Sequence, residues 1–105
     1  MAKKVKQVKG FYMNRKTGHP SYGFSQHYNE VKSIGFTHNK EDFSKKIKLK
    51  HNIDPKDRRA CYAKTVIEIQ KSNTYRKSES LKSFRIHKDD KVVIEKIIKT
   101  NKKRR

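Results

Sequence analysis

Two short stretches in the first half of the chain alternate between aromatic or aliphatic residues and small or polar ones. Tyr22 and Phe24 carry the pattern in the first stretch, and Ile34 and Phe36 carry it in the second. A period of two is typical of half-buried β-strands. Polar residues separate the two stretches, so the pattern predicts a β-hairpin over residues 20–38.

Residues 46–51 alternate strictly, which predicts a third strand. Ile47 and Leu49 are expected to face inward. The outer face is then wholly basic, with Lys46, Lys48 and Lys50. The segment 52–59 is expected to be a loop with a turn at Asp54-Pro55.

The strongest strand pattern covers residues 60–70. One face of this strand would hold Cys61, Ala63, Thr65, Ile67 and Ile69. The next segment, 71–82, is rich in Ser and Lys and has no period, which predicts a flexible loop.

A helix is expected over residues 88–101. Asp89 and Asp90 lie near its first turn, where carboxylates complement the helix dipole. An apolar stripe at helical spacing follows, made of Val93, Ile94, Ile97 and Ile98. The expected fold class is therefore α+β, a small antiparallel sheet of about four strands covered by one C-terminal helix.

The net charge of the chain indicates what kind of partner it binds. The 105 residues include 29 Lys and Arg but only 10 Asp and Glu, a formal net charge of +19. Such a charge repels itself and exceeds what solubility needs, so a polyanion is the expected partner. We expect RNA or DNA, alone or in a ribonucleoprotein, and keep open an acidic protein partner or antitoxin.

The charge is also uneven along the chain, since the first 29 residues contain no acid. We expect a partly mobile basic arm at 1–16, one α+β domain at 17–101 and a basic tail at 102–105. No apolar run reaches the roughly 20 residues of a membrane span, and no secretory signal is visible. The single cysteine, Cys61, is consistent with a reducing compartment, so a cytoplasmic location is expected.

Candidate chemistry is limited, because the chain has no phosphate-binding glycine loop and no metal-binding His/Cys spacing. We therefore expect neither a metal ion nor a cofactor. RNA can still be cut by activating its own 2′-hydroxyl, which needs a general base, a general acid and cations. His19 and His38 lie at the same end of the predicted hairpin and are our candidate catalytic pair. Each could instead be a structural loop residue.

Nucleic-acid contacts are expected from the arm, the basic strand face, the loop and the tail. The candidates are Lys3, Lys4, Lys46, Lys48, Lys50, Arg58, Arg59, Tyr62, Lys102, Lys103, Arg104 and Arg105. Structural roles stay open for three of these candidates. Arg58 or Arg59 could pair with Asp57, and Tyr62 could pack on the sheet rather than stack on a base.

Several short segments together resemble a set of small basic proteins from phages and mobile elements of Gram-positive bacteria. They are His19-Pro20-Ser21-Tyr22, Ile34-Gly35-Phe36-Thr37-His38, Ile47-Lys48-Leu49 and Asn52-Ile53-Asp54-Pro55-Lys56-Asp57-Arg58 with Tyr62. In that set the sequence of the loop is nearer to Asn-Pro-Asn-Pro, and a Ser follows the His at the end of the second strand. Here Ile53 and Asn39 stand at those positions. The resemblance covers roughly residues 19–98.

The expected layout of sheet, basic groove and helix also looks like barnase, colicin and RelE-type ribonucleases. That likeness implies a metal-independent endoribonuclease, such as a toxin or a phage-defence component. Two alternatives remain: a non-catalytic RNA- or DNA-binding protein, and a phage-borne inhibitor of a nucleic-acid enzyme, similar in role to anti-CRISPR proteins.

Overall fold

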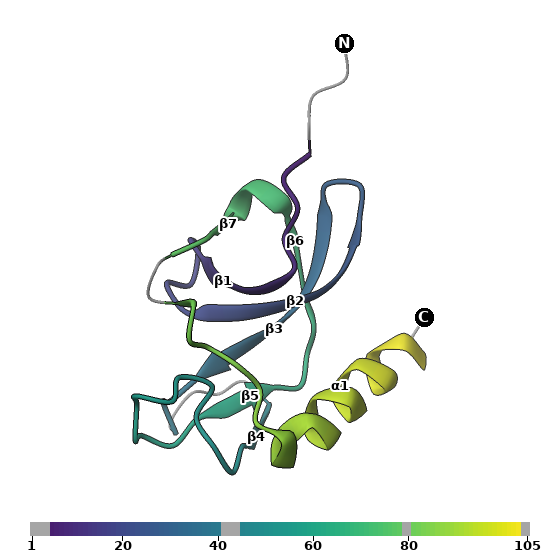
Figure 1. Ribbon diagram of the computed structural model, residues 1–105. Coiled ribbons are helices and arrows are strands. Elements are labelled where there is room, and N and C mark those ends of the chain that lie inside the picture. Colours follow the sequence, from purple (N-terminus) through teal and green to yellow (C-terminus); the bar gives the residue numbers. More distant parts are fainter. Residues whose placement is uncertain (1–4, 41–44, 79–80, 104–105) are drawn as a thin grey trace.

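The chain folds into a curved antiparallel sheet followed by one α-helix, as the computed structural model shows (Figure 1). The structure describes residues 5–40, 45–78 and 81–103. Its strands are β1 (Gly10–Asn14), β2 (Pro20–His27), β3 (Glu30–Thr37), β4 (Lys46–Lys48), β5 (Tyr62–Lys64), β6 (Glu68–Lys71) and β7 (Tyr75–Arg76). Single 3₁₀ turns, η1 (Ser72–Thr74) and η3 (Lys88–Asp90), precede β7 and the helix α1 (Lys91–Lys103).

The strand order is β4-β5-β3-β2-β1-β7, and β6 also pairs with β3. Every pairing is antiparallel. The α+β class and the C-terminal helix are confirmed. The sheet is larger than the expected four strands, because seven strands lie within the described residues.

The predicted hairpin is formed by β2 and β3. Their register pairs His27 with Glu30 at the turn and Ser21 with Gly35 near the other end. Tyr28 adopts a φ of 56°, in the left-handed region that a tight two-residue turn requires. The alternation in this part of the sequence therefore predicted both strands and the turn between them.

The predicted strand 60–70 is broken into β5 and β6. Both pieces pair with β3, but the register moves by two residues between them. Asn101 of α1 satisfies the backbone at the break: its Nδ2 donates to the Thr65 carbonyl at 3.0 Å, and its Oδ1 accepts from the Ile67 N–H at 3.4 Å. The expected inner face is only partly buried at its end, since Ile67 is half-buried and Ile69 is 54% exposed.

The predicted third strand is shorter than expected, since β4 ends at Lys48. Leu49 is buried as predicted, but Ile47 is 37% exposed rather than inward-facing. The difference arises because β4 is the edge strand of the sheet and has only β5 as a neighbour.

The Ser- and Lys-rich segment 71–82 is more ordered than its sequence indicated. It contains η1 and β7, and Tyr75 is fully buried with its hydroxyl 2.7 Å from Ser33 Oγ. Part of the expected basic arm is likewise built into the fold, since β1 lies between β2 and β7 and Val8 is buried. Residues 1–4 of the arm lie outside the described residues.

The core has two parts, one on each face of β3. Ile34 and Phe36 belong to the larger part, where they pack with loop and helix residues such as Ile53 and Ile94. Cys61 also lies there, and burial raises the pKa of its thiol. Val31 points the other way, into a smaller cluster with Val8 and Tyr75. Two segments that the sequence predicted to be mobile therefore cover one face of β3, and the helix covers the other.

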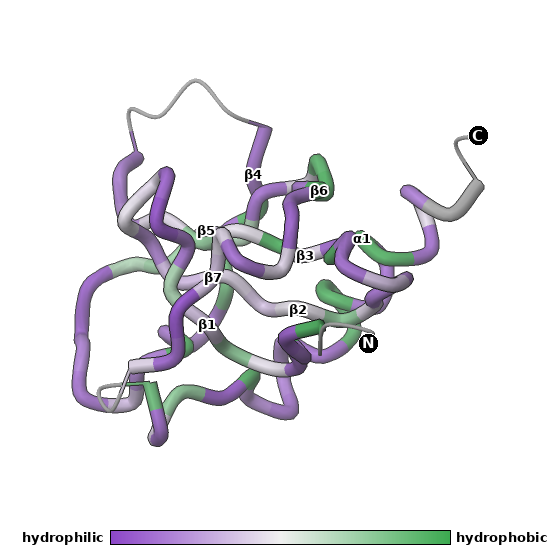
Figure 2. Tube along the Cα trace, turned by 90° about the horizontal axis from the view of Figure 1, so that it is seen from above, coloured by the Kyte–Doolittle hydropathy of each residue, from purple (hydrophilic) through white to green (hydrophobic). Residues whose placement is uncertain are grey.

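The helix packs through the stripe that the sequence predicted. Ile94 and Ile97 are buried, whereas Val92 is 71% exposed. Figure 2 shows hydrophobic and hydrophilic stretches alternating along α1. The buried Asp90 fixes the start of the helix, because its carboxylate accepts from the backbone N–H groups of Lys50 at 2.8 Å and His51 at 2.9 Å. Among the described residues, no helix is long and apolar enough to cross a membrane.

Candidate nucleic-acid interface

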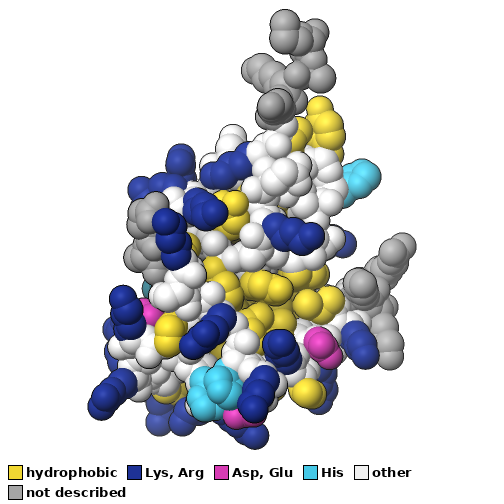
Figure 3. Space-filling view, in the orientation of Figure 1, with side chains coloured by type: hydrophobic (Ala, Val, Ile, Leu, Met, Phe, Trp, Pro, Cys, Tyr) yellow, Lys and Arg dark blue, Asp and Glu magenta, His cyan; other side chains and the backbone are white. Residues whose placement is uncertain are grey.

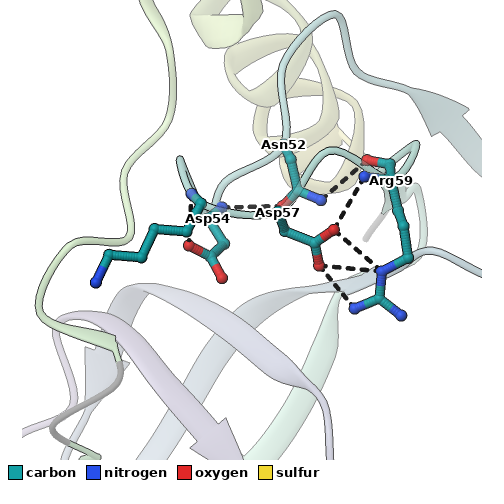
Figure 4. Close-up of polar contacts among 5 residues, drawn as sticks. Asn52, Asp54, Asp57 and Arg59 are labelled. Atoms are coloured by element: carbon teal, nitrogen blue, oxygen red, sulfur yellow. Dashed lines mark hydrogen bonds and ion pairs between the residues drawn. The ribbon is translucent and has the colours of Figure 1, made fainter.

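The loop 52–59 holds its shape through its own Asn and Asp side chains (Figure 4). Asn52 Oδ1 accepts from the N–H of Asp54 at 2.9 Å, and Asp54 Oδ1 accepts from the N–H of Lys56 at 3.0 Å. Asn52 Nδ2 donates to the carbonyl of Arg59 at 3.0 Å, which ties the two ends of the loop together. The predicted turn is present, since the Asp57 N–H donates to the Asp54 carbonyl. A loop fixed in this way can present side chains in set positions.

Asp57 and Arg59 form an ion pair within this loop. The Asp57 carboxylate accepts from Arg59 Nε at 3.0 Å, from Nη2 at 2.7 Å and from the backbone N–H at 2.9 Å. The side-chain bonds of Arg59, followed by its backbone N–H, lower the pKa of Asp57 to about 2. Of the two expected arginines, Arg59 is therefore the one that Asp57 pairs with.

One side of the loop borders a pocket of about 590 Å³, here called the basic pocket. Its cationic lining comes from Lys48, Lys50, Arg58, Arg59 and Arg85, with His51 and His87 beside them. Asp54 and Asp57 are the acids in this lining, and Asp57 is occupied by Arg59. Within the described part of the chain, no carboxylate lies at ion-pair distance from Lys48, Lys50, Arg58 or Arg85. The pocket therefore carries uncompensated positive charge.

The other side of the loop borders a smaller pocket of about 180 Å³, here called the histidine pocket. His19 precedes β2 and His38 follows β3, so the hairpin register brings them together as predicted. Their ring centroids are 6.4 Å apart, and the rings meet edge to face at 79°. His38 is exposed and His19 is half-buried. The pair is thus accessible from solvent.

The two pockets share the loop as a common wall. Five residues line both of them: Asn52, Asp54, Asp57, Arg59 and Cys61. An extended ligand could therefore contact the basic pocket and the histidine pair at the same time. His38 is near enough to Asp57 that its cationic form further lowers the pKa of that carboxyl.

The remaining predicted contact residues are only partly brought together. Lys46 places its ammonium 5.8 Å from the ring centroid of Tyr62, which is half-buried in β5. Neither residue lines the basic pocket. The side chains of the other candidates lie outside the described residues: Lys3, Lys4, Lys102, Lys103, Arg104 and Arg105.

Sequence reasoning missed Arg85 and His87 in the basic pocket. Both lie in the segment between β7 and η3, which has no periodic pattern. The backbone N–H of Arg85 donates to the carbonyl of Ile53 at 2.9 Å, and this long-range contact brings the segment to the loop. The only signal in the sequence was the basic and imidazole character of the residues themselves.

A hydrophobic band crosses the middle of the face seen in Figure 3, with Lys and Arg side chains on both sides of it. An apolar groove of about 540 Å³ lies between the sheet and α1. Its apolar lining comes from Phe11, Tyr22, Phe24, Phe84, Ile86, Ile94 and Ile98. Arg85, Lys91 and Glu95 supply its charged lining.

Comparison of this chain with protein-family models, curated proteins and solved structures finds no match. Its likeness to phage and mobile-element proteins, and to ribonucleases, therefore remains an expectation. The two pockets and the loop between them are the features of this chain that bear on its function.

Proposed function

We propose that this protein binds RNA and cleaves it without a metal ion, with His19 and His38 as general base and general acid. The observation that supports this proposal most directly is the shared wall of the two pockets. It puts a group of phosphate-binding cations next to a pair of imidazoles. By its resemblance to phage and mobile-element proteins, we further propose that it acts in the bacterial cytoplasm.

Binding is the first part of the proposal. A phosphate backbone is held by Lys and Arg side chains that release its condensed counterions. Lys48, Lys50 and Arg58 offer such groups in one concave site, and Arg85 adds a fourth. Arg can contact phosphate through two parallel hydrogen bonds, so Arg58 and Arg85 would fix the register of the backbone.

Cleavage is the second part. The 2′-hydroxyl must lose a proton and the leaving 5′-oxygen must gain one, so two proton-transfer groups must flank one phosphate. Imidazoles titrate near neutral pH and can serve in either role. With ring centroids 6.4 Å apart, one bound phosphodiester could contact both rings. Arg59 lines the same pocket, and although Asp57 holds its Nε and Nη2, its Nη1 would remain to donate to the phosphate.

The experiment is incubation of end-labelled RNA with the protein in EDTA, followed by a denaturing gel. We expect fragments ending in a cyclic phosphate, and we expect His38→Ala to abolish them while RNA binding changes little. His27→Ala is the matched control, because His27 is an exposed histidine at the opposite end of the same hairpin. Cleavage that requires magnesium, or that survives loss of both His19 and His38, would exclude this mechanism.

A second candidate function is inhibition of a nucleic-acid enzyme by binding to it, and the apolar groove favours it. Concave, mainly apolar sites with a few charged groups at their edges are typical of binding sites. A net charge of +19 makes an acidic partner the complementary one. Pull-down from nuclease-treated host lysate separates the two functions, because a protein partner survives that treatment. Lys91→Glu, at the exposed charged rim of the groove, should then reduce capture of an acidic partner and leave RNA binding largely unchanged.

A further inference from the structure

We propose that His51, His87 and Asp89 form a binding site for one divalent transition-metal ion such as Zn²⁺, at the rim of the basic pocket. This inference is independent of RNA binding and cleavage. It differs from the sequence-based expectation that the chain holds no metal. The ligands lie too far apart along the chain to show a metal-binding spacing.

The fold brings these three residues together through Asp90. His51 follows β4, His87 precedes η3 and Asp89 lies within η3. The buried carboxylate of Asp90 accepts the backbone N–H of His51 and of the residue before it. The segment after β4 is therefore fixed against the start of the helix, and the three ligands are placed before any ion binds.

The distances between the ligand atoms fit a small ion. One ligand atom from each residue lies within 4.8 Å of the others. Asp89 Oδ2 is 3.0 Å from His51 Nε2 and 3.4 Å from His87 Nδ1. Zinc bonds of about 2.0–2.1 Å in tetrahedral geometry separate neighbouring ligand atoms by about 3.3 Å. Two of the three spacings are thus already near the required value.

The ligand set selects a class of metal. Two imidazole nitrogens and one carboxylate oxygen suit Zn²⁺, Co²⁺ or Ni²⁺, whereas Mg²⁺ and Ca²⁺ prefer oxygen ligands alone. The hydrogen bond between His51 Nε2 and Asp89 Oδ2, 3.0 Å long, would be replaced by bonds from both atoms to the ion. The three side chains are between 39% and 44% exposed, so an ion can enter from solvent and keep a position open.

The site also has identifiable costs. His87 Nδ1 accepts the backbone N–H of Asp89 at 3.1 Å, and an ion bound at this nitrogen would replace that hydrogen bond. The His51 and His87 rings are stacked, with centroids 3.7 Å apart, and must turn slightly for both to reach one ion. Lys50 and Arg85 line the same pocket and repel a cation. These costs favour a reversible site over a permanent structural one.

The site has a consequence for the basic pocket. His51 and His87 line that pocket, so a bound ion would add two positive charges to it. A phosphate oxygen of a ligand in that pocket could then complete the coordination.

The test is titration of the purified full chain with Zn²⁺, with no nucleic acid present, by isothermal calorimetry and thermal melting. We expect one equivalent to bind and to raise Tm by at least about 4 °C at saturation. His51→Ala, His87→Ala and Asp89→Asn should each weaken binding at least about tenfold. His27→Ala, which changes an exposed histidine outside the cluster, should bind as the wild type does.

A spectroscopic measurement on the wild type still tests the proposal if a variant folds poorly. Co²⁺ added to the wild type should give the visible absorption of a tetrahedral nitrogen- and oxygen-ligated ion, and Asp89→Asn should lose it. Zinc binding that is equally strong in wild type and Asp89→Asn, or no binding at millimolar Zn²⁺, would overturn the proposal. Both results are obtained without RNA, so failure here leaves the proposed ribonuclease activity to be tested separately.

Discussion

Asp57 holds the guanidinium of Arg59 through two parallel hydrogen bonds, Nε to Oδ1 at 3.0 Å and Nη2 to Oδ2 at 2.7 Å. The neighbouring Arg58 has no such partner among the described residues. Two adjacent arginines therefore have different roles in the structure. One is built into the loop between the pockets, and the other is available to a ligand.

The first prediction concerns the pKa of Asp57. Arg59 holds it at about 2, below its ordinary value of 3.8. A lowered folded-state pKa contributes stability above about pH 4, and this contribution is lost as the pH falls through the folded-state value. Arg59→Ala should raise the pKa of Asp57 towards 3.8. NMR titration of the carboxyl carbon measures both values, and a wild-type midpoint near 4 would show that the ion pair does not persist in solution.

The second prediction separates the two arginines by their effect on nucleic-acid binding. Arg58→Ala should weaken binding of single-stranded RNA and reduce the slope of log K against log salt by about 0.7, the value for one phosphate contact. Arg59→Ala should change the salt slope less, because Asp57 already neutralises that guanidinium. Electrophoretic shifts at several salt concentrations give both slopes. Equal loss of slope in the two variants would contradict the distinction.

The sequence predicted most of the helix and the hairpin because their patterns are local. The stripe at Ile94 and Ile97 and the alternation at Ile34 and Phe36 each repeat within a few residues, and both are buried in the structure. The meeting of His19 and His38 also followed from hairpin pairing alone. Local periodicity was therefore enough to predict both the central elements and the proximity of the candidate catalytic pair.

The sequence did not predict features that depend on contacts between distant segments. Tyr75 lies in an aperiodic stretch, and its burial depends on Val8 and Val31. The break between β5 and β6 depends on Asn101, more than thirty positions away. The cluster of His51 with Asp89 depends on a carboxylate from η3. No pattern within a short window contains this information.

The third prediction tests the helix packing with a matched pair. Ile94→Ala should lower the free energy of unfolding by about 2–5 kcal/mol, because it removes a buried side chain from the main core. Val92→Ala, on the exposed side of the same helix, should change it by less than about 0.5 kcal/mol. Urea denaturation followed by circular dichroism measures both. Similar losses in the two variants would show that α1 does not pack against the sheet through the face that holds Ile94.

The fourth prediction tests the smaller core behind β3. Tyr75→Phe keeps the ring but leaves the buried Ser33 Oγ without its 2.7 Å hydrogen bond. An unsatisfied buried hydroxyl costs about 1–3 kcal/mol. The loss should appear in urea denaturation and should be largely absent when Ser33→Ala is made in the same chain. If the double variant is as unstable as the sum of the two single variants, the hydrogen bond is not the cause.

The central claim is that the basic pocket binds a nucleic-acid backbone, and its salt dependence tests this most directly. Fluorescence anisotropy with labelled single-stranded RNA should show affinity falling steeply as salt rises. Joint replacement of Lys48, Arg58 and Arg85 by Ala should reduce the slope by about 2. Joint replacement of Lys71, Lys96 and Lys99, exposed lysines outside this pocket, removes the same charge and should reduce it less. No binding at low ionic strength, or equal losses in the two triple variants, would contradict the account.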